Sequence, residues 1–74
     1  MALIFSLTMN IQLNGSLHEI AAVMTVSELL ASIGYGNKPC VVELDGQPVF
    51  PRDCGSMTVK QGSRVEVVTL AAGG

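Results

Sequence analysis

Apolar and polar side chains alternate over residues 9–13 (MNIQL). A period of two predicts a β-strand with one buried face. Asn14-Gly15 follows, and this dipeptide is typical of a two-residue hairpin turn because both residues tolerate a positive φ. We therefore expect a hairpin whose second strand returns antiparallel over residues 17–23.

A helix start follows the predicted hairpin. Thr25-Val26-Ser27-Glu28 fits a capping box, in which the Thr25 hydroxyl accepts a hydrogen bond from the Glu28 amide and the Glu28 carboxylate reaches back to the Thr25 amide. Gly34 and Gly36 are expected to end the helix in left-handed conformations. So short a helix is not stable alone, and it must pack on a sheet. The apolar stripe that would face this sheet comprises Val26, Leu29, Leu30 and Ile33.

The second half of the chain is rich in β-branched residues, and turn signals divide it. In chain order we predict a strand at 40–44 (CVVEL), a tight turn at 45–46, a short strand at 47–50, an irregular stretch from 51 to about 57–59, a turn at 61–63 and a last strand at 64–70 (RVEVVTL).

The order strand, strand, helix, strand, short strand, strand predicts an α+β fold with one main helix packed across one sheet. This is the order of the ubiquitin-like β-grasp fold, whose first and last strands pair in parallel at the sheet centre. We expect a mixed sheet of four to five strands in one domain over residues 1–74. Residues 1–8 are interpreted as an N-terminal extension, with Met1 and Met9 both open as the start, and residues 71–74 as a flexible C-terminal tail.

Composition narrows the functional classes. A chain of 74 residues leaves no room for a two-domain enzyme, and its 49% hydrophobic content fits a folded core rather than disorder. The net charge of −2 without a basic run argues against nucleic acid. No apolar run approaches the roughly 20 residues of a membrane span, and the N-terminus lacks signal-peptide features. We therefore expect a cytoplasmic protein.

Few side chains here could perform catalysis. His18 has no acidic or serine partner at a motif spacing, so we interpret it as a surface residue. Cys40 and Cys54 do not form a zinc-binding pattern and are interpreted as buried reduced thiols, with their role left open. Activation of Cys54 by Arg52 is the alternative to a loop cysteine packed under the sheet. We expect no enzyme activity, no metal and no bound cofactor.

The terminal Gly73-Gly74 is the feature with a distinct chemical interpretation. Attack of a C-terminal carboxylate on the α-phosphate of ATP would convert this end of the chain into a reactive acyl-adenylate. To reach a nucleotide in another enzyme, the tail must be slender, and glycine permits close backbone approach because it has no Cβ. Ala71 and Ala72 continue this slender profile. The alternative is an end of small residues without a function.

From Met9 to Gly74 the chain resembles the ThiS family, the small sulfur carriers of bacterial thiamine biosynthesis. Each matching segment alone is a weak signal, whereas their order, spacing and total length together are specific. The segments are Met9 to Gly15 (MNIQLNG), Thr25 to Leu30 (TVSELL), Val42 to Arg52 (VELDGQPVFPR), Gln61 to Val68 (QGSRVEVV) and Gly73-Gly74.

This resemblance implies a carrier whose Gly74 carboxylate is adenylated with ATP by a ThiF-like enzyme and then converted to a thiocarboxylate. A cysteine desulfurase relay would supply the sulfur, and a thiazole synthase of the ThiG type would receive it. Gly73, Ala72 and Ala71 would be recognised in the tail, and Leu70 would contact a partner. Two alternatives remain, a carrier like the small subunit of molybdopterin synthase and a non-covalent ubiquitin-like interaction module.

Overall fold

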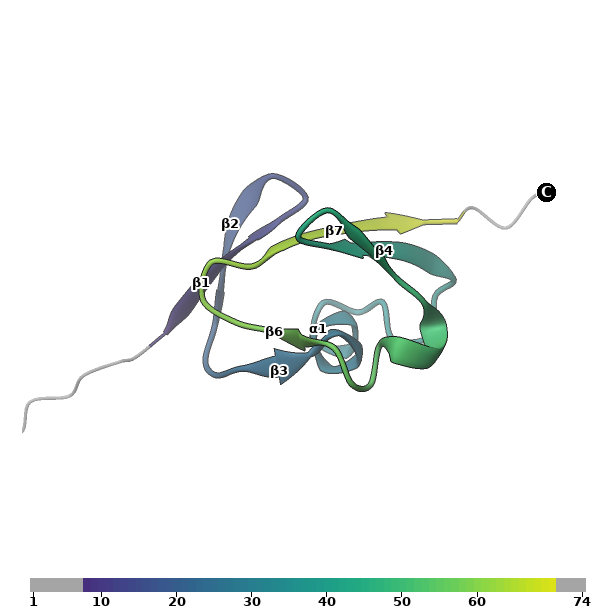
Figure 1. Ribbon diagram of the computed structural model, residues 1–74, viewed down its shortest axis with the longest axis horizontal. Coiled ribbons are helices and arrows are strands. Elements are labelled where there is room, and N and C mark those ends of the chain that lie inside the picture. The colour runs from purple at the N-terminus through teal and green to yellow at the C-terminus, as the bar shows by residue number, and fades with distance from the viewer. Residues whose placement is uncertain (1–7, 71–74) are drawn as a thin grey trace, which may run out of the picture.

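The computed structural model describes residues 8–70 (Figure 1). Predicted features that fall on residues 1–7 and 71–74, including the N-terminal extension and the tail, lie outside the described residues. The elements in chain order are β1 (Met9–Leu13), β2 (Ser16–Ile20), β3 (Met24–Thr25), α1 (Val26–Ser32), β4 (Cys40–Leu44), β5 (Gln47–Val49), the 3-10 turn η1 (Pro51–Asp53), β6 (Thr58–Val59) and β7 (Arg64–Thr69).

Five strands form one mixed sheet in the order β2-β1-β7-β4-β5. β1 and β7 run parallel, with Gln12 opposite Arg64 and Leu13 opposite Val65. The other neighbouring strands of this sheet are antiparallel. The prediction of parallel first and last strands at the sheet centre is confirmed, and β7 is the middle strand.

Both hairpin turns form where the dipeptides predict them. Asn14 and Gly15 have φ values of 51° and 81°, and Asp45 and Gly46 have values of 51° and 82°. Positive φ at both central positions gives the twist that suits a two-residue hairpin. These turns set the register of β1 against β2 and of β4 against β5.

The second strand is shorter than predicted. β2 ends at Ile20, not at Val23, because Ile20 pairs with Met9, the first residue of β1, and no further partner follows. The exposed residues 21–23 then lead to β3, which pairs with β6 in a small antiparallel ribbon that the sequence did not predict. β5 and β7 likewise end one residue earlier than expected, at Val49 and Thr69.

The helix begins with the predicted capping box. The Thr25 hydroxyl accepts from the Glu28 amide at 3.1 Å, and the Glu28 carboxylate accepts from the Thr25 amide at 2.9 Å. Gly34 follows the helix with φ 86°, as expected. The expected left-handed conformation of Gly36 is wrong. A Cβ on Gly36 would lie 3.4 Å from Ala31 Cα, so this glycine instead lets the loop run close to α1.

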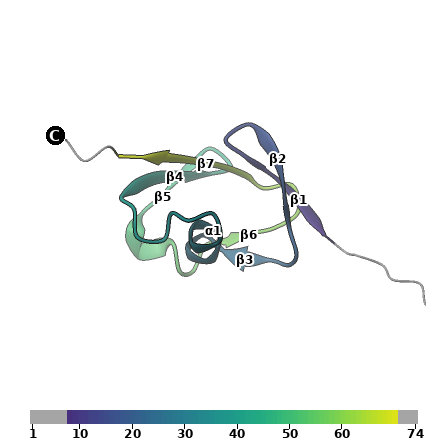
Figure 2. The same cartoon turned by 180° about the vertical axis from the view of Figure 1, so that it is seen from behind.

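The core lies between the five-stranded sheet and a second layer made of α1, β3 and β6 (Figures 1 and 2). Leu29 of the helix and Val59 of the ribbon are fully buried, so both parts of the second layer contribute to it. Alternate residues of the strands point into the same space. The buried apolar residues are Ile11, Ile20, Val26, Leu29, Leu30, Val42, Leu44, Val49, Val59, Val65 and Val67.

Candidate functional site

The predicted reactive residues Gly73 and Gly74, and Ala71 and Ala72 before them, lie outside the described residues. The chain reaches them through Leu70, which is 52% exposed. The Leu70 amide donates to the Pro39 carbonyl at 2.9 Å, one residue before β4 begins. This hydrogen bond joins Leu70, the last of the described residues, to the start of β4.

Side chains from two hairpin turns hold β7, the strand that leads to the tail. The Asn14 side-chain oxygen accepts from the Val67 amide at 2.7 Å, and the Asp45 carboxylate accepts from the Arg64 amide at 2.8 Å. Both turn residues thus continue the hydrogen bonding of β7 where the neighbouring strand turns away. Sequence reasoning assigned them only to turns, although their side-chain oxygens are common acceptors for backbone amides.

The face of the sheet opposite α1 carries exposed apolar side chains. Val41 of β4 lies directly opposite Val68 of β7, and these two residues, named here the open-face valine pair, are 51% and 60% exposed. Leu17 is exposed farther away, on β2. Such apolar patches commonly mark partner surfaces.

Two carboxylates lie next to the open-face valine pair, on the same strands. Glu43 of β4 lies directly opposite Glu66 of β7. Like charges in this position destabilise a sheet, because the two side chains lie close together. Arg64 and Asp45 line a small hollow with these two residues. The open face therefore combines an apolar pair near the tail with an acidic pair farther from it.

A cavity of about 470 Å³ lies on the other side of the sheet, next to α1. Its apolar lining includes Leu30 and Val42, and Leu70 contributes to it where the chain leaves the sheet. Cys40 and Cys54 also line this cavity. Neither thiol is joined in a disulfide, and both are only half-buried, so the prediction that they are buried is wrong.

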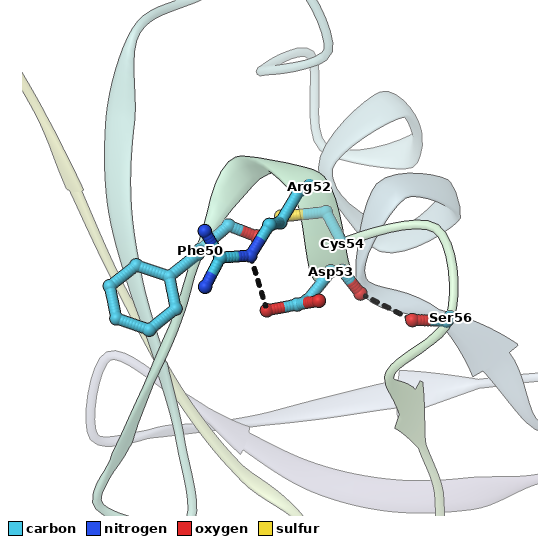
Figure 3. A network of polar contacts seen from close by, with 5 residues as sticks. All are labelled: Phe50, Arg52, Asp53, Cys54 and Ser56. Atoms are coloured by element: carbon cyan, nitrogen blue, oxygen red, sulfur yellow. Dashed lines mark hydrogen bonds and ion pairs between the residues drawn. The ribbon is translucent and has the colours of Figure 1, made fainter.

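Cys54 follows the turn η1 and packs against the core (Figure 3). Its Sγ donates weakly to the Phe50 carbonyl at 3.5 Å. Burial, the nearby Cys40 and Asp53 together raise the pKa of the Cys54 thiol. Arg52 contacts Asp53 at 3.8 Å and lies 5.1 Å from the centre of the Phe50 ring. These contacts favour the packed cysteine over a thiol activated by Arg52.

The remaining candidates do not form a site. His18 is partly exposed in β2, opposite Ile11. Between residues 8 and 70, no three His, Cys, Asp or Glu side chains gather closely enough to hold a metal ion. Within the same range, no helix is both long and apolar enough to cross a membrane.

A mixed sheet with its last strand at the centre, crossed by one helix, defines a ubiquitin-like β-grasp protein. The chain belongs to the ThiS family, whose model matches residues 11–74. A crystal structure of a thiamine biosynthesis protein (ThiS) from Geobacter metallireducens is similar, with 30% identity, a TM-score of 0.77, and coverage of 89% of this chain and 100% of that chain.

A solution structure of a thiamine biosynthesis protein from the same organism gives a consistent result. It shares 33% identity and a TM-score of 0.69, over 89% of this chain and 88% of that chain. No curated protein sequence matches the chain. The family assignment therefore depends on the family model and on these solved structures.

Proposed function

We propose that this protein is a sulfur carrier of thiamine biosynthesis and not itself an enzyme. The observation that carries the proposal is the extent of the family match, which continues to Gly74 and so includes the terminal Gly73-Gly74. Both similar structures are of thiamine biosynthesis proteins. They favour thiazole formation over the alternative of a pterin acceptor.

In the proposed reaction, a carboxylate oxygen of Gly74 attacks the α-phosphate of ATP on a ThiF-like enzyme, and pyrophosphate leaves. A sulfur nucleophile from a cysteine desulfurase relay then attacks the Gly74 carbonyl carbon and displaces AMP. With a persulfide as the donor, this product is an acyl disulfide. Attack of a further thiolate on the donor cysteine sulfur breaks its S–S bond, releases the Gly74 thiocarboxylate and leaves the donor cysteine in a disulfide with that thiol. A ThiG-type thiazole synthase accepts the thiocarboxylate. We place these steps in the cytoplasm, where ATP is available.

The anchoring of Leu70 sets a condition on the activating enzyme. Four residues, Ala71 to Gly74, follow Leu70, and four residues span at most about 14 Å. The enzyme must therefore bring its nucleotide within that distance of Leu70, which places the carrier surface around the end of β7 against the enzyme. We propose that Leu70 and the open-face valine pair form this contact, while Ala71, Ala72 and Gly73 enter the channel.

The experiment combines the protein with a ThiF-like enzyme, ATP and a sulfur source, and measures the intact mass. The expected gain is the mass difference between sulfur and oxygen, located at Gly74 by fragmentation. A variant lacking Gly74 is the matched control and should gain nothing. An unchanged mass of the intact chain, or full rescue of a carrier-deficient strain by the variant, would favour a non-covalent interaction module instead.

A further inference from the structure

The cavity beside α1 brings together both cysteines of the chain, which the proposed carrier chemistry does not use. Cys40 is the first residue of β4, and Cys54 follows η1. Each is half-buried, packs against the hydrophobic core and lines this cavity. The cavity lining thus carries two half-buried thiols.

The register of the β4–β5 hairpin places the thiols on the same side. Val42 lies opposite Val49. Continuing this register by two residues in each direction puts Pro51 across from Cys40. The chain turns into η1 at Pro51. A 3-10 helix has three residues per turn, so side chains at positions i and i+3 lie one above the other. Cys54 therefore lies over Pro51, and both Cys54 and Cys40 line the same cavity.

Two further observations agree with this placement. The Cys54 amide donates to the Pro51 carbonyl at 3.4 Å, which closes the 3-10 turn. Cys40 is also among the groups that raise the pKa of the Cys54 thiol, after burial and before Asp53. Figure 3 shows the Cys54 side chain directed back across the turn toward Phe50.

We propose that Cys40 and Cys54 form a redox site that closes to an intramolecular disulfide with a low-molecular-weight disulfide such as oxidised glutathione. One protein thiolate attacks a sulfur of the oxidant, which forms a mixed disulfide and releases one glutathione thiolate. The second protein thiolate attacks the protein sulfur of that mixed disulfide and releases the other. The protein loses two electrons and two protons, and the oxidant becomes two thiols.

The bond would join β4 to η1 across the cavity. It closes the chain from residue 40 to residue 54, and such a cross-link stabilises the fold by restricting the unfolded chain. It also lies beside Leu70, since Cys40 pairs with Thr69 of β7. Formation of the disulfide would therefore change the surroundings of the point at which the chain leaves the sheet. This inference does not depend on modification of Gly74.

The test incubates the folded full-length protein with oxidised glutathione and follows the intact mass and the non-reduced peptides. The expected product has lost the mass of two hydrogen atoms and contains a peptide linking Cys40 to Cys54. Its thermal midpoint should exceed that of the reduced protein and return after reduction. C40S and C54S, each checked for folding by circular dichroism, are matched controls that should retain one glutathione adduct.

A second measurement separates native proximity from chance encounter. The same oxidation in urea gives the closure rate of the unfolded chain, and the folded protein should close faster if the thiols face each other. Adducts on both cysteines of the folded wild type, disulfide-linked dimers as the main product, or closure slower than in urea would each overturn the proposal.

Discussion

The side-chain oxygen of Asn14 accepts the backbone amide of Val67 at 2.7 Å, which joins the first hairpin turn to the middle of the last strand. The two residues are 53 positions apart in the sequence. The Asn14 amide also donates to the Val65 carbonyl at 2.9 Å. Asn14 thus extends the parallel pairing of β1 and β7 beyond Leu13, the last residue of β1.

Replacing Asn14 should measure this hydrogen bond. N14G keeps the left-handed backbone but removes the acceptor from the amide of the buried Val67, so we expect a loss of about 1–3 kcal/mol in the free energy of unfolding. N14D retains both the acceptor and the tolerance of positive φ, and should remain closer to the wild type. Urea unfolding measures both variants. Equal stability of N14G and the wild type would show that water replaces the side chain.

Substitution by alanine should affect the two glycines after α1 to different extents. G34A should cost roughly 1–2 kcal/mol because φ is 86° there, although a Cβ at that position meets no atom within 4 Å. G36A has an ordinary φ and places its Cβ 3.4 Å from Ala31, so we expect a change below about 1 kcal/mol. Thermal or urea unfolding tests the pair. A larger loss in G36A than in G34A would contradict this assignment.

The contribution of the capping box to the free energy of unfolding should depend on pH. T25A is expected to cost about 1 kcal/mol at neutral pH. Hydrogen bonds from the Thr25 amide and then its hydroxyl lower the pKa of Glu28 below 4.5 in the folded state. The contribution of the Glu28 charge is therefore complete above the unfolded pKa and is lost as the pH falls through the folded pKa.

E28A tests the direction of this pH dependence. Its stability difference from the wild type should be largest at pH above 4.5 and shrink under more acidic conditions, when the carboxylate becomes protonated in both states. Urea unfolding over a range of pH values measures the difference. A difference that is constant across the range would mean that Glu28 acts through its apolar stem and not through its charge.

The acidic pair of Glu43 and Glu66 on the open face should destabilise the fold. E66K places a cation opposite Glu43, and we expect a gain of about 0.2–1 kcal/mol that decreases in high salt. E19K is the matched control, since Glu19 lies opposite the neutral Asn10. Equal effects of the two substitutions would indicate that net charge matters and the pairing does not.

The open-face valine pair should matter for activation more than for folding. Val68 is 60% exposed, so V68S should unfold near the wild-type temperature but reduce the kcat/KM of adenylation by about tenfold, equivalent to about 1.4 kcal/mol. Pyrophosphate exchange on a ThiF-like enzyme provides the measurement. L17S, on the more distant β2, is the control. Equal losses in the two variants would place the contact elsewhere.

Local signals allowed much of the fold to be predicted from the sequence. The Asn14-Gly15 and Asp45-Gly46 turns and the capping box depend on neighbouring residues, and each forms where expected. The ribbon of β3 and β6 was missed because two-residue strands show no periodicity. The end of β2 was misplaced because the start of β1 determines it.

Prediction of the site was limited in the same way, because a sequence shows local motifs but not the contacts between distant residues. The terminal Gly73-Gly74 could be recognised as a motif, and the partner role of Leu70 stays a prediction. The contact of Asn14 with Val67 could not be predicted, because only the folded sheet brings them together. The pairing of Cys40 and Cys54 in one cavity depends likewise on the hairpin register and the η1 turn.

The central position of β7 also determines how the fold would respond to mechanical load. A pull on the tail acts along β7, whereas its hydrogen bonds to β1 and β4 lie across the strand. Such a pull loads these bonds in shear, so many must break together before the strand slides. The central position of β7 thereby protects the fold against being unravelled from its C-terminal end.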